Sequence, residues 1–151
     1  MKFIAHRGNT DGRTILENHP SYIEFALWQG FEAEVDVWVY KNCLWLGHDT
    51  PMHKIEEQFL IERRKLLWCH AKNVEALQKL SLMEMNAFGH SSDPFVVTTK
   101  GDIIMHNNST WKPGVIVMCP EKTGECNGIK RVAGLCSDYV SKYKERYDKE
   151  L

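Results

Sequence analysis

Four short segments of the chain place ionisable side chains at the end of an apolar run. These segments are His6-Arg7, Glu34-x-Asp36, His48-Asp49 and His70-x-Lys72. Two carboxylates that lie two positions apart on a strand point to the same face, where together they can bind one hard cation. Without a cation the like charges repel each other, and one carboxylate tends to take up a proton. We therefore predict that Glu34 and Asp36 are metal ligands.

Histidine and arginine complete a set of groups that suits the cleavage of a phosphate ester. Two histidines beside a metal can act as general acid and general base. The guanidinium of Arg7 can hold phosphate oxygens through paired hydrogen bonds. A metal ion stabilises the charge that develops on the phosphate. These residue types therefore indicate a metal-dependent site for a phosphate ester.

Alternating strands and helices are expected to bring these residues together. Residues 33–39 alternate as a strand does, with alanine and valines on one face and Glu34, Asp36 and Trp38 on the other. Strands are expected at residues 3–5, 33–39, 43–46, 66–71, 87–88, 95–98, 103–105, 115–118 and 134–136, and helices at 20–29, 54–63, 74–80 and 139–150. This order favours a parallel sheet, in which the carboxyl ends of the strands share one rim.

The order and spacing of four motifs resemble those of the glycerophosphodiester phosphodiesterases. The motifs are His6-Arg7-Gly8, Glu17-Asn18, Glu34-Val35-Asp36 and Gly47-His48-Asp49. This family folds as a TIM barrel and hydrolyses glycerophosphodiesters to an alcohol and glycerol 3-phosphate, with one divalent cation that is usually magnesium or calcium. The resemblance implies that His6 and His48 are the acid–base pair. It also implies that Arg7 binds the phosphate and that Glu17 supports the site.

The sequence departs from the family pattern at one metal ligand. The resemblance makes Glu34 and Asp36 two ligands, and the family usually supplies a third carboxylate in a Glu-x-Lys pattern. The corresponding segment here reads His70-Ala71-Lys72, so Lys72 fits as a second cation that faces the phosphate. Because imidazole favours softer ions, His70 adds manganese, iron or zinc to the candidate metals. Whether His70 ligates the ion or only lines the pocket stays open.

A second set of segments resembles a short bacterial branch of the same family. It comprises His70-Ala71-Lys72-Asn73, His90 with Asp93, Thr98 with Gly101, and Cys136-Ser137-Asp138-Tyr139. This resemblance implies that His90, Asp93 and Asp138 also reach the rim. The other histidines, His19, His53 and His106, are expected to be surface or structural residues.

The chain length limits how complete a barrel can be. A TIM barrel typically uses about 250 residues, whereas this chain has 151. We therefore predict one catalytic domain over residues 1–151, with a shortened, TIM-barrel-like α/β fold that has lost some helices. Residues 95–118 leave little room for a helix, so hairpins are expected to join some strands there. An incomplete barrel would expose apolar flanks, which favours a homodimer.

Composition and charge exclude several other classes of protein. Lys plus Arg is 19 and Asp plus Glu is 20, so there is no basic surplus to wrap nucleic acid. No apolar run approaches the roughly 18 to 20 residues of a membrane span, and the N-terminal apolar stretch is too short for a signal peptide. We therefore expect a cytoplasmic protein. Its five cysteines are expected to be buried free thiols, in preference to a Cys119–Cys126 disulfide.

Two functions fit these observations. The first is a metal-dependent phosphodiesterase that acts on a glycerophosphodiester or a related small phosphodiester. The second is a catalytically degenerate form of the same fold that binds a phosphorylated ligand. The short chain and the missing third carboxylate motivate the second function. The intact pair His6 and His48 favours the enzyme, because a binding protein has little need for both histidines.

Overall fold

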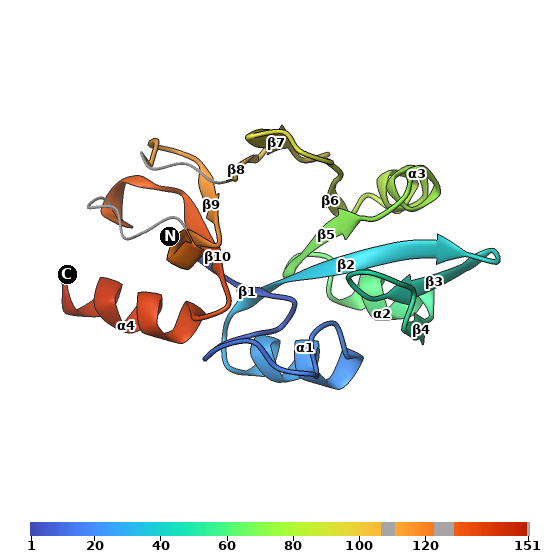
Figure 1. Ribbon diagram of the computed structural model, residues 1–151, viewed down its shortest axis with the longest axis horizontal. Helices are drawn as coiled ribbons and strands as arrows, with labels where there is room; N and C mark the ends of the chain where they lie inside the picture. The colour runs from blue at the N-terminus through green and yellow to red at the C-terminus, as the bar shows by residue number, and fades with distance from the viewer. Residues whose placement is uncertain (107–110, 123–128, 151) are drawn as a thin grey trace.

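A computed structural model of the chain describes residues 1–106, 111–122 and 129–150 (Figure 1). Its strands are β1 (Lys2–His6), β2 (Glu32–Tyr40), β3 (Cys43–Leu46), β4 (His53–Ile55), β5 (Leu67–Ala71), β6 (Asn86–Phe88), β7 (Phe95–Val97), β8 (Ile103–Met105), β9 (Ile116–Met118) and β10 (Gly134–Ser137). Its α-helices are α1 (Pro20–Trp28), α2 (Glu57–Glu62), α3 (Val74–Leu82) and α4 (Val140–Lys149). The predicted alternation of strands and helices is confirmed.

The parallel strands follow one another round an arc in the order of a barrel. Strand β1 lies between β2 and β10 and is parallel to both. Parallel pairing continues from β2 to β5 and β6, and from β10 to β9 and β8. The first strand of the chain therefore pairs with the last, which is the pairing that closes a barrel (Figure 1). The carboxyl ends of these strands meet at one rim, as the sequence predicts.

Helices support mainly the half of the sheet that contains β2 and β5. Residues Ala33, Val35 and Val37 on β2 are fully buried, in a core that also contains Ile23 of α1 and Leu80 of α3. These two helices begin where expected. Helix α1 has proline in its first turn, and α3 is capped by the side chain of Asn73.

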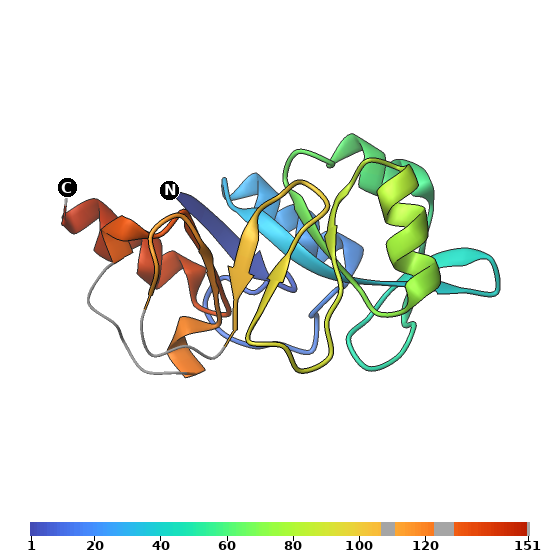
Figure 2. The same ribbon diagram turned by 90° about the horizontal axis from the view of Figure 1, so that it is seen from above.

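The other half of the sheet has few helices. Between β6 and β10 the described residues contain only two short 3₁₀ turns, Pro120–Lys122 and Ile129–Arg131. Figure 2 shows this part of the chain, coloured yellow to orange, as short strands and connecting loops. The expected loss of helices is thus confirmed over the described part of the second half. The expected hairpin is β7 with β8, which pair in antiparallel fashion.

The series of paired strands is interrupted between β6 and the β7–β8 hairpin. Strand β6 pairs with β5 and strand β7 pairs with β8. Thr99, which follows β7, links the two sides: its backbone N–H donates to the Ala87 carbonyl at 2.8 Å. Its hydroxyl donates to the Met85 carbonyl at 2.7 Å. The barrel is therefore held at this seam by one short segment instead of a full strand ladder.

The prediction of one helix over residues 54–63 is wrong at its start. Residues His53–Ile55 form β4, which pairs with β3, and α2 covers only Glu57–Glu62. Ile55 is buried opposite Leu44 in this pairing. Burial against β3 therefore determines the conformation of this segment, overriding its local helical pattern.

Two further sequence predictions concern cysteines and membrane spans. Cys69, Cys119 and Cys136 are buried free thiols, as predicted, whereas Cys43 is a free thiol that is only partly buried. Cys126 lies outside the described residues, so its pairing with Cys119 is not addressed. No helix in the described part of the chain is long and apolar enough to cross a membrane.

Candidate active site at the carboxyl ends of the strands

The structure brings most of the predicted site residues together at the rim. His6 ends β1, Glu34 and Asp36 lie on the face of β2 opposite its valines, and His70 lies near the end of β5. A cavity of about 180 Å³ opens among them. It is lined by His6, Arg7, Glu34, His48, His70, Phe88, His90, His106, Met118, Cys119 and Lys122.

The two carboxylates of β2 are buried and differ in their surroundings. Asp36 Oδ2 accepts a hydrogen bond from Asn18 Nδ2 at 2.9 Å and lies 3.2 Å from Arg7 Nε. Burial opposes the ionisation of Asp36, but contacts with His48, His70 and Arg7 outweigh it and hold its pKa well below the usual range. The pKa of Glu34 is raised instead, by burial and by the negative charge of Asp36. The pair thus behaves as two like charges forced together.

The donor atoms of Glu34, Asp36 and His70 fit a divalent cation. One ligand atom from each residue lies within 4.8 Å of the others. Asp36 Oδ1 is buried and lies 3.1 Å from His70 Nδ1, yet it has no hydrogen-bond partner of acceptable geometry among the described residues. A cation would satisfy this oxygen and reduce the repulsion between the carboxylates. The imidazole of His70 stacks on Phe88 with ring centroids 4.9 Å apart, which fixes its orientation.

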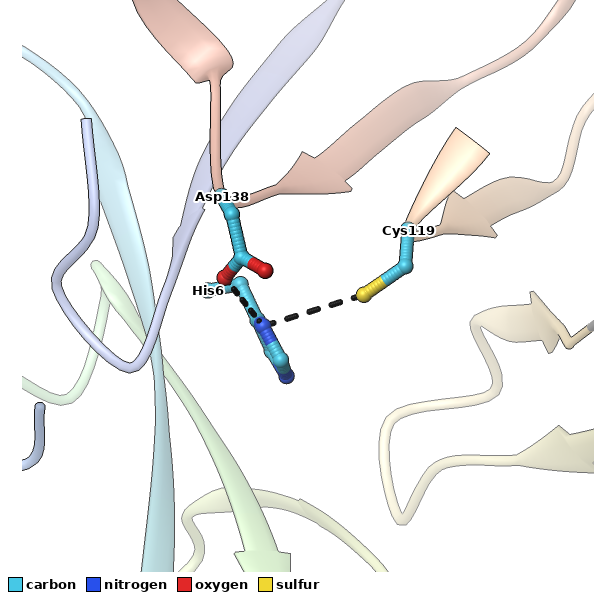
Figure 3. A group of neighbouring side chains, drawn as sticks. All are labelled: His6, Cys119 and Asp138. Atoms are coloured by element: carbon cyan, nitrogen blue, oxygen red, sulfur yellow. Dashed lines mark hydrogen bonds and ion pairs between the residues drawn. The ribbon is translucent and has the colours of Figure 1, made fainter. Parts of the chain in front are cut away.

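His6 is held between two side chains from the last strands (Figure 3). Its Nδ1 donates to Asp138 Oδ1 at 2.7 Å and lies 3.7 Å from Cys119 Sγ. Its Nε2 lies 3.9 Å from Glu34 Oε2. Burial opposes protonation of the ring, but the contacts with Asp138, Cys119 and Glu34 raise the pKa of His6 to about 10. His6 is therefore a ring that carries a proton at neutral pH.

Arg7 lines the cavity, and carboxylates bind both its side chain and its backbone N–H. Its backbone is in the left-handed region, with φ 54°, an uncommon conformation for a side chain of this size. Nη1 donates to Glu17 Oε2 at 3.1 Å, and the backbone N–H donates to Glu34 Oε2 at 3.2 Å. Glu17 also accepts from Asn9 and Arg13. The guanidinium is thus oriented before any ligand is present.

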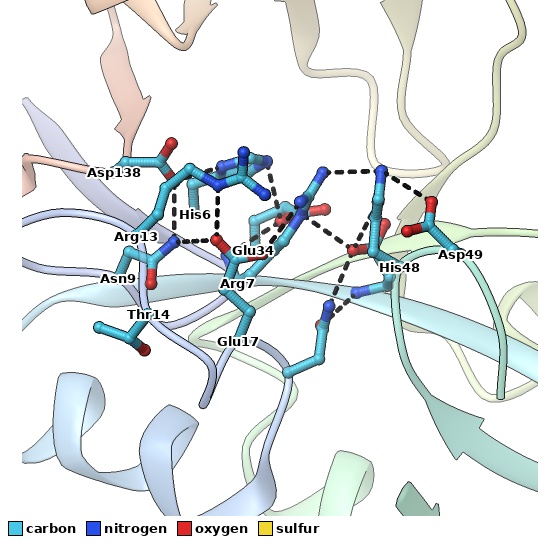
Figure 4. A network of polar contacts seen from close by, with 12 residues as sticks. His6, Arg7, Asn9, Arg13, Thr14, Glu17, Glu34, His48, Asp49 and Asp138 are labelled. Carbon is cyan, nitrogen blue, oxygen red and sulfur yellow. Dashed lines mark hydrogen bonds and ion pairs between the residues drawn. The ribbon is translucent and has the colours of Figure 1, made fainter. Parts of the chain in front are cut away.

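His48 lies across Arg7 from His6 (Figure 4). Its side chain is partly exposed, and its Nδ1 donates to Asp36 Oδ2 at 3.3 Å. Its Nε2 accepts from Arg7 Nη2 at 3.2 Å. These contacts favour the tautomer in which Nδ1 carries the proton and Nε2 carries the lone pair that accepts from Arg7.

The remaining predicted residues lie at different distances from the cavity. The ammonium of Lys72 lies 3.5 Å from Asp36 Oδ1, but Lys72 does not line the cavity. His90 lines it, with its ring stacked on His70 at 4.9 Å. Asp93 is exposed on the loop between β6 and β7 and does not line it. Asp138 reaches the rim through its contact with His6.

The site also contains residues that sequence reasoning did not assign to it, among them Asn18, Asn9 and His106. Asn18 is buried and holds both the side chain and the backbone N–H of Asp36, and it belongs to the Glu17-Asn18 motif. Asn9 is buried and donates to Asp138 and Glu17. His106, expected at the surface or in a structural role, lines the cavity instead. Its position directly after β8 is the signal that could have found it.

Comparisons with known proteins support the fold. No protein-family model and no curated protein matches the sequence. The structure is similar to the crystal structure of a glycerophosphodiester phosphodiesterase from Parabacteroides distasonis, with a TM-score of 0.54 and 12% identity. The match covers 99% of this chain and 98% of that chain. The chain therefore has a shortened, TIM-barrel-like α/β fold of the glycerophosphodiester phosphodiesterase type, as predicted.

Proposed function

We propose that this chain is a metal-dependent phosphodiester hydrolase that acts on a glycerophosphodiester or a related small phosphodiester. One observation carries the proposal: His6, Arg7, Glu34 and His48 line one cavity, at the rim where an α/β barrel places its active site. The similarity in fold to a phosphodiesterase supports the same reaction class.

The residues divide into those that bind and those that move protons. Glu34, Asp36 and His70 would hold one divalent cation. When bound, the cation supplies electrostatic stabilisation of the phosphate as negative charge develops on it. Arg7 and Lys72 are cationic side chains in contact with the carboxylate Asp36, and they would bind the nonbridging phosphate oxygens.

His6 and His48 suit opposite steps of acid–base catalysis. Asp138 stabilises the protonated form of His6, so His6 would donate a proton to the departing alkoxide. The lone pair of His48 Nε2 accepts from Arg7, so His48 would take the proton from the attacking hydroxyl once the phosphate replaces it as the partner of Arg7. The two rings lie on either side of Arg7, which would place the phosphate between them (Figure 4).

One observation favours the alternative, a catalytically degenerate fold that binds a phosphorylated ligand. The candidate metal site has two carboxylates, and His70 stands where the family usually supplies a third. In this alternative the site would recognise a phosphate without turning it over. The intact His6 and His48 argue for the enzyme.

Hydrolysis by variants of the two histidines tests the proposal. Bis(p-nitrophenyl) phosphate and glycerophosphocholine would be offered with a divalent cation to the wild type, His6→Ala and His48→Ala. Each variant should lose about a hundredfold or more in turnover. His53→Ala is the matched control, because His53 lies on β4 and does not line the cavity. Near-normal rates in both catalytic variants would refute the proposal.

The same experiment distinguishes the alternative function. If the wild type turned over neither substrate with any cation, the enzyme proposal would fail. A rise in melting temperature on adding glycerol 3-phosphate would then support the binding protein.

A further inference from the structure

The cavity has a second wall, which the proposed reaction does not use. This wall comes from the ends of β6, β8 and β9, and we call it the distal wall. It is defined by His90, His106 and Lys122. The carboxylate among the residues that line the cavity is Glu34, which lies on β2. The distal wall therefore contributes nitrogen groups and no carboxylate to the described lining of the cavity.

Two ring nitrogens of the distal wall lack protein partners. His90 Nδ1 and His106 Nε2 are buried, and neither has a hydrogen-bond partner among the described residues. The two rings lie side by side, with centroids 4.1 Å apart. Buried polar atoms are normally satisfied, and leaving one unsatisfied is costly. Both rings line the cavity, so a ligand there can supply the missing partner.

Lys122 supplies the positive charge of the distal wall, and Asp138 is a carboxylate whose pKa it lowers. Lys122 lies at the end of the turn that comes after β9, with its backbone N–H bonded to the Cys119 carbonyl at 3.0 Å. Its ammonium forms no ion pair with any described residue. Burial and the nearby histidines His90, His70 and His6 lower the pKa of His106 to about 4, so this ring is uncharged at neutral pH. Two acidic groups act on His90, namely Asp93, whose side chain is exposed on the loop, and the buried Asp36.

We infer that His90, His106 and Lys122 form a second anion-binding subsite, and that the substrate is a phosphodiester that also carries a phosphomonoester. This inference rests on the proposed function, because the diester phosphate occupies the site of Arg7 and the metal ligands. The phosphomonoester would accept N–H bonds from the two imidazoles and a charged bond from Lys122. A phosphomonoester offers enough acceptor oxygens for all three donors.

Two matched substrates test the inference. Glycerophosphoinositol and glycerophosphoinositol 4-phosphate contain the same diester and differ by one phosphomonoester. The wild type should show a kcat/KM about tenfold or more higher for the 4-phosphate, which is the effect of one charge-assisted hydrogen bond. Lys122→Ala should lower this ratio about tenfold, and His106→Asn should lower it in the same direction. Lys142→Ala, an exposed lysine of α4, should leave the ratio unchanged.

The ratio of the two kcat/KM values can be measured in Lys122→Ala even if His106→Asn folds poorly. Lys122 is exposed, so its truncation should not disturb the core. A wild-type ratio near one would overturn the inference. So would a ratio that Lys122→Ala leaves unchanged.

Binding to the chelated protein separates this inference from the proposed function. Without metal there is no turnover, and titration calorimetry would compare the two inositol compounds with inorganic phosphate. Tighter binding of the 4-phosphate, lost in Lys122→Ala, supports the subsite even if hydrolysis is absent and the proposed function fails. Hydrolysis of both compounds without a binding difference sinks the subsite alone. Equal binding of inorganic phosphate and the 4-phosphate would assign the subsite to free phosphate and overturn the substrate class.

Discussion

Asp138 and His106 lie at the same rim, and their polar atoms are partnered very differently. Asp138 accepts from His6 at 2.7 Å and from Asn9 at 2.9 Å, and its backbone N–H donates to Glu121. His106 Nε2 is buried among the described residues without a partner. Asp138 lies just before α4, whereas His106 lies in the part of the barrel that has lost its helices. The protein itself thus orients the groups around His6, whereas the proposed ligand would complete the distal wall.

Of the changes considered, the loss of the Asp36 side chain should lower the free energy of unfolding most. In the metal-free protein, Asp36→Ala leaves Arg7 and Lys72 without the buried carboxylate that both contact. Loss of one partner from a buried ion pair typically costs about 3–5 kcal/mol. Urea unfolding of the chelated protein would measure this loss. A change below about 1 kcal/mol would show that the network does not support the fold.

The pH dependence of stability should reveal the His6–Asp138 pair. The pKa of His6 is raised from 6.5 to about 10 in the folded protein, so the folded state binds more protons than the unfolded state between these values. The stabilisation is therefore complete below about pH 6.5 and is lost as pH rises through about 10. Unfolding of the chelated wild type at pH 7 and pH 10 should show this loss. Asp138→Asn should reduce it, and equal losses in both proteins would contradict the assignment.

Replacement of His106 in the distal wall should lower the stability of the protein much less than replacement of Asp36. His106→Leu removes a buried nitrogen that has no partner among the described residues and keeps a similar side-chain volume. The free energy of unfolding should change by less than about 1 kcal/mol, since no hydrogen bond of that nitrogen is lost. Thermal unfolding of this variant beside Asp36→Ala measures the contrast directly. A loss as large as that of Asp36→Ala would show that His106 has a structural role after all.

The parts that sequence reasoning predicted are those with a repeating or positional signal. His6 and His70 lie at or near the end of an apolar run, and Glu34 alternates with buried apolar residues along β2, so strand periodicity and parallel pairing place all three at the same rim. The helical spacing of apolar residues, together with the residues that start a helix, predicted the helices that begin at Pro20 and after Asn73.

The parts that were missed depend on contacts between distant segments. Asn9 and Asn18 lie in an irregular loop, and their roles come from Asp138 and Asp36, which no local pattern connects to them. The start of α2 was misplaced because pairing with β3 decides the conformation of β4. His106 comes directly after a strand of only three residues, and so short an apolar run is a weak sign that the next side chain lies at the rim.

The most direct test of the central claim is metal-dependent hydrolysis of bis(p-nitrophenyl) phosphate. The protein would be assayed after chelation and again after magnesium, calcium, manganese or zinc is added singly, with Asp36→Asn as the matched variant. We predict that chelation abolishes turnover, that at least one cation restores it, and that Asp36→Asn is not restored. Full activity in the chelated wild type, or no activity with any of the four cations, would contradict a metal-dependent phosphodiesterase at this rim.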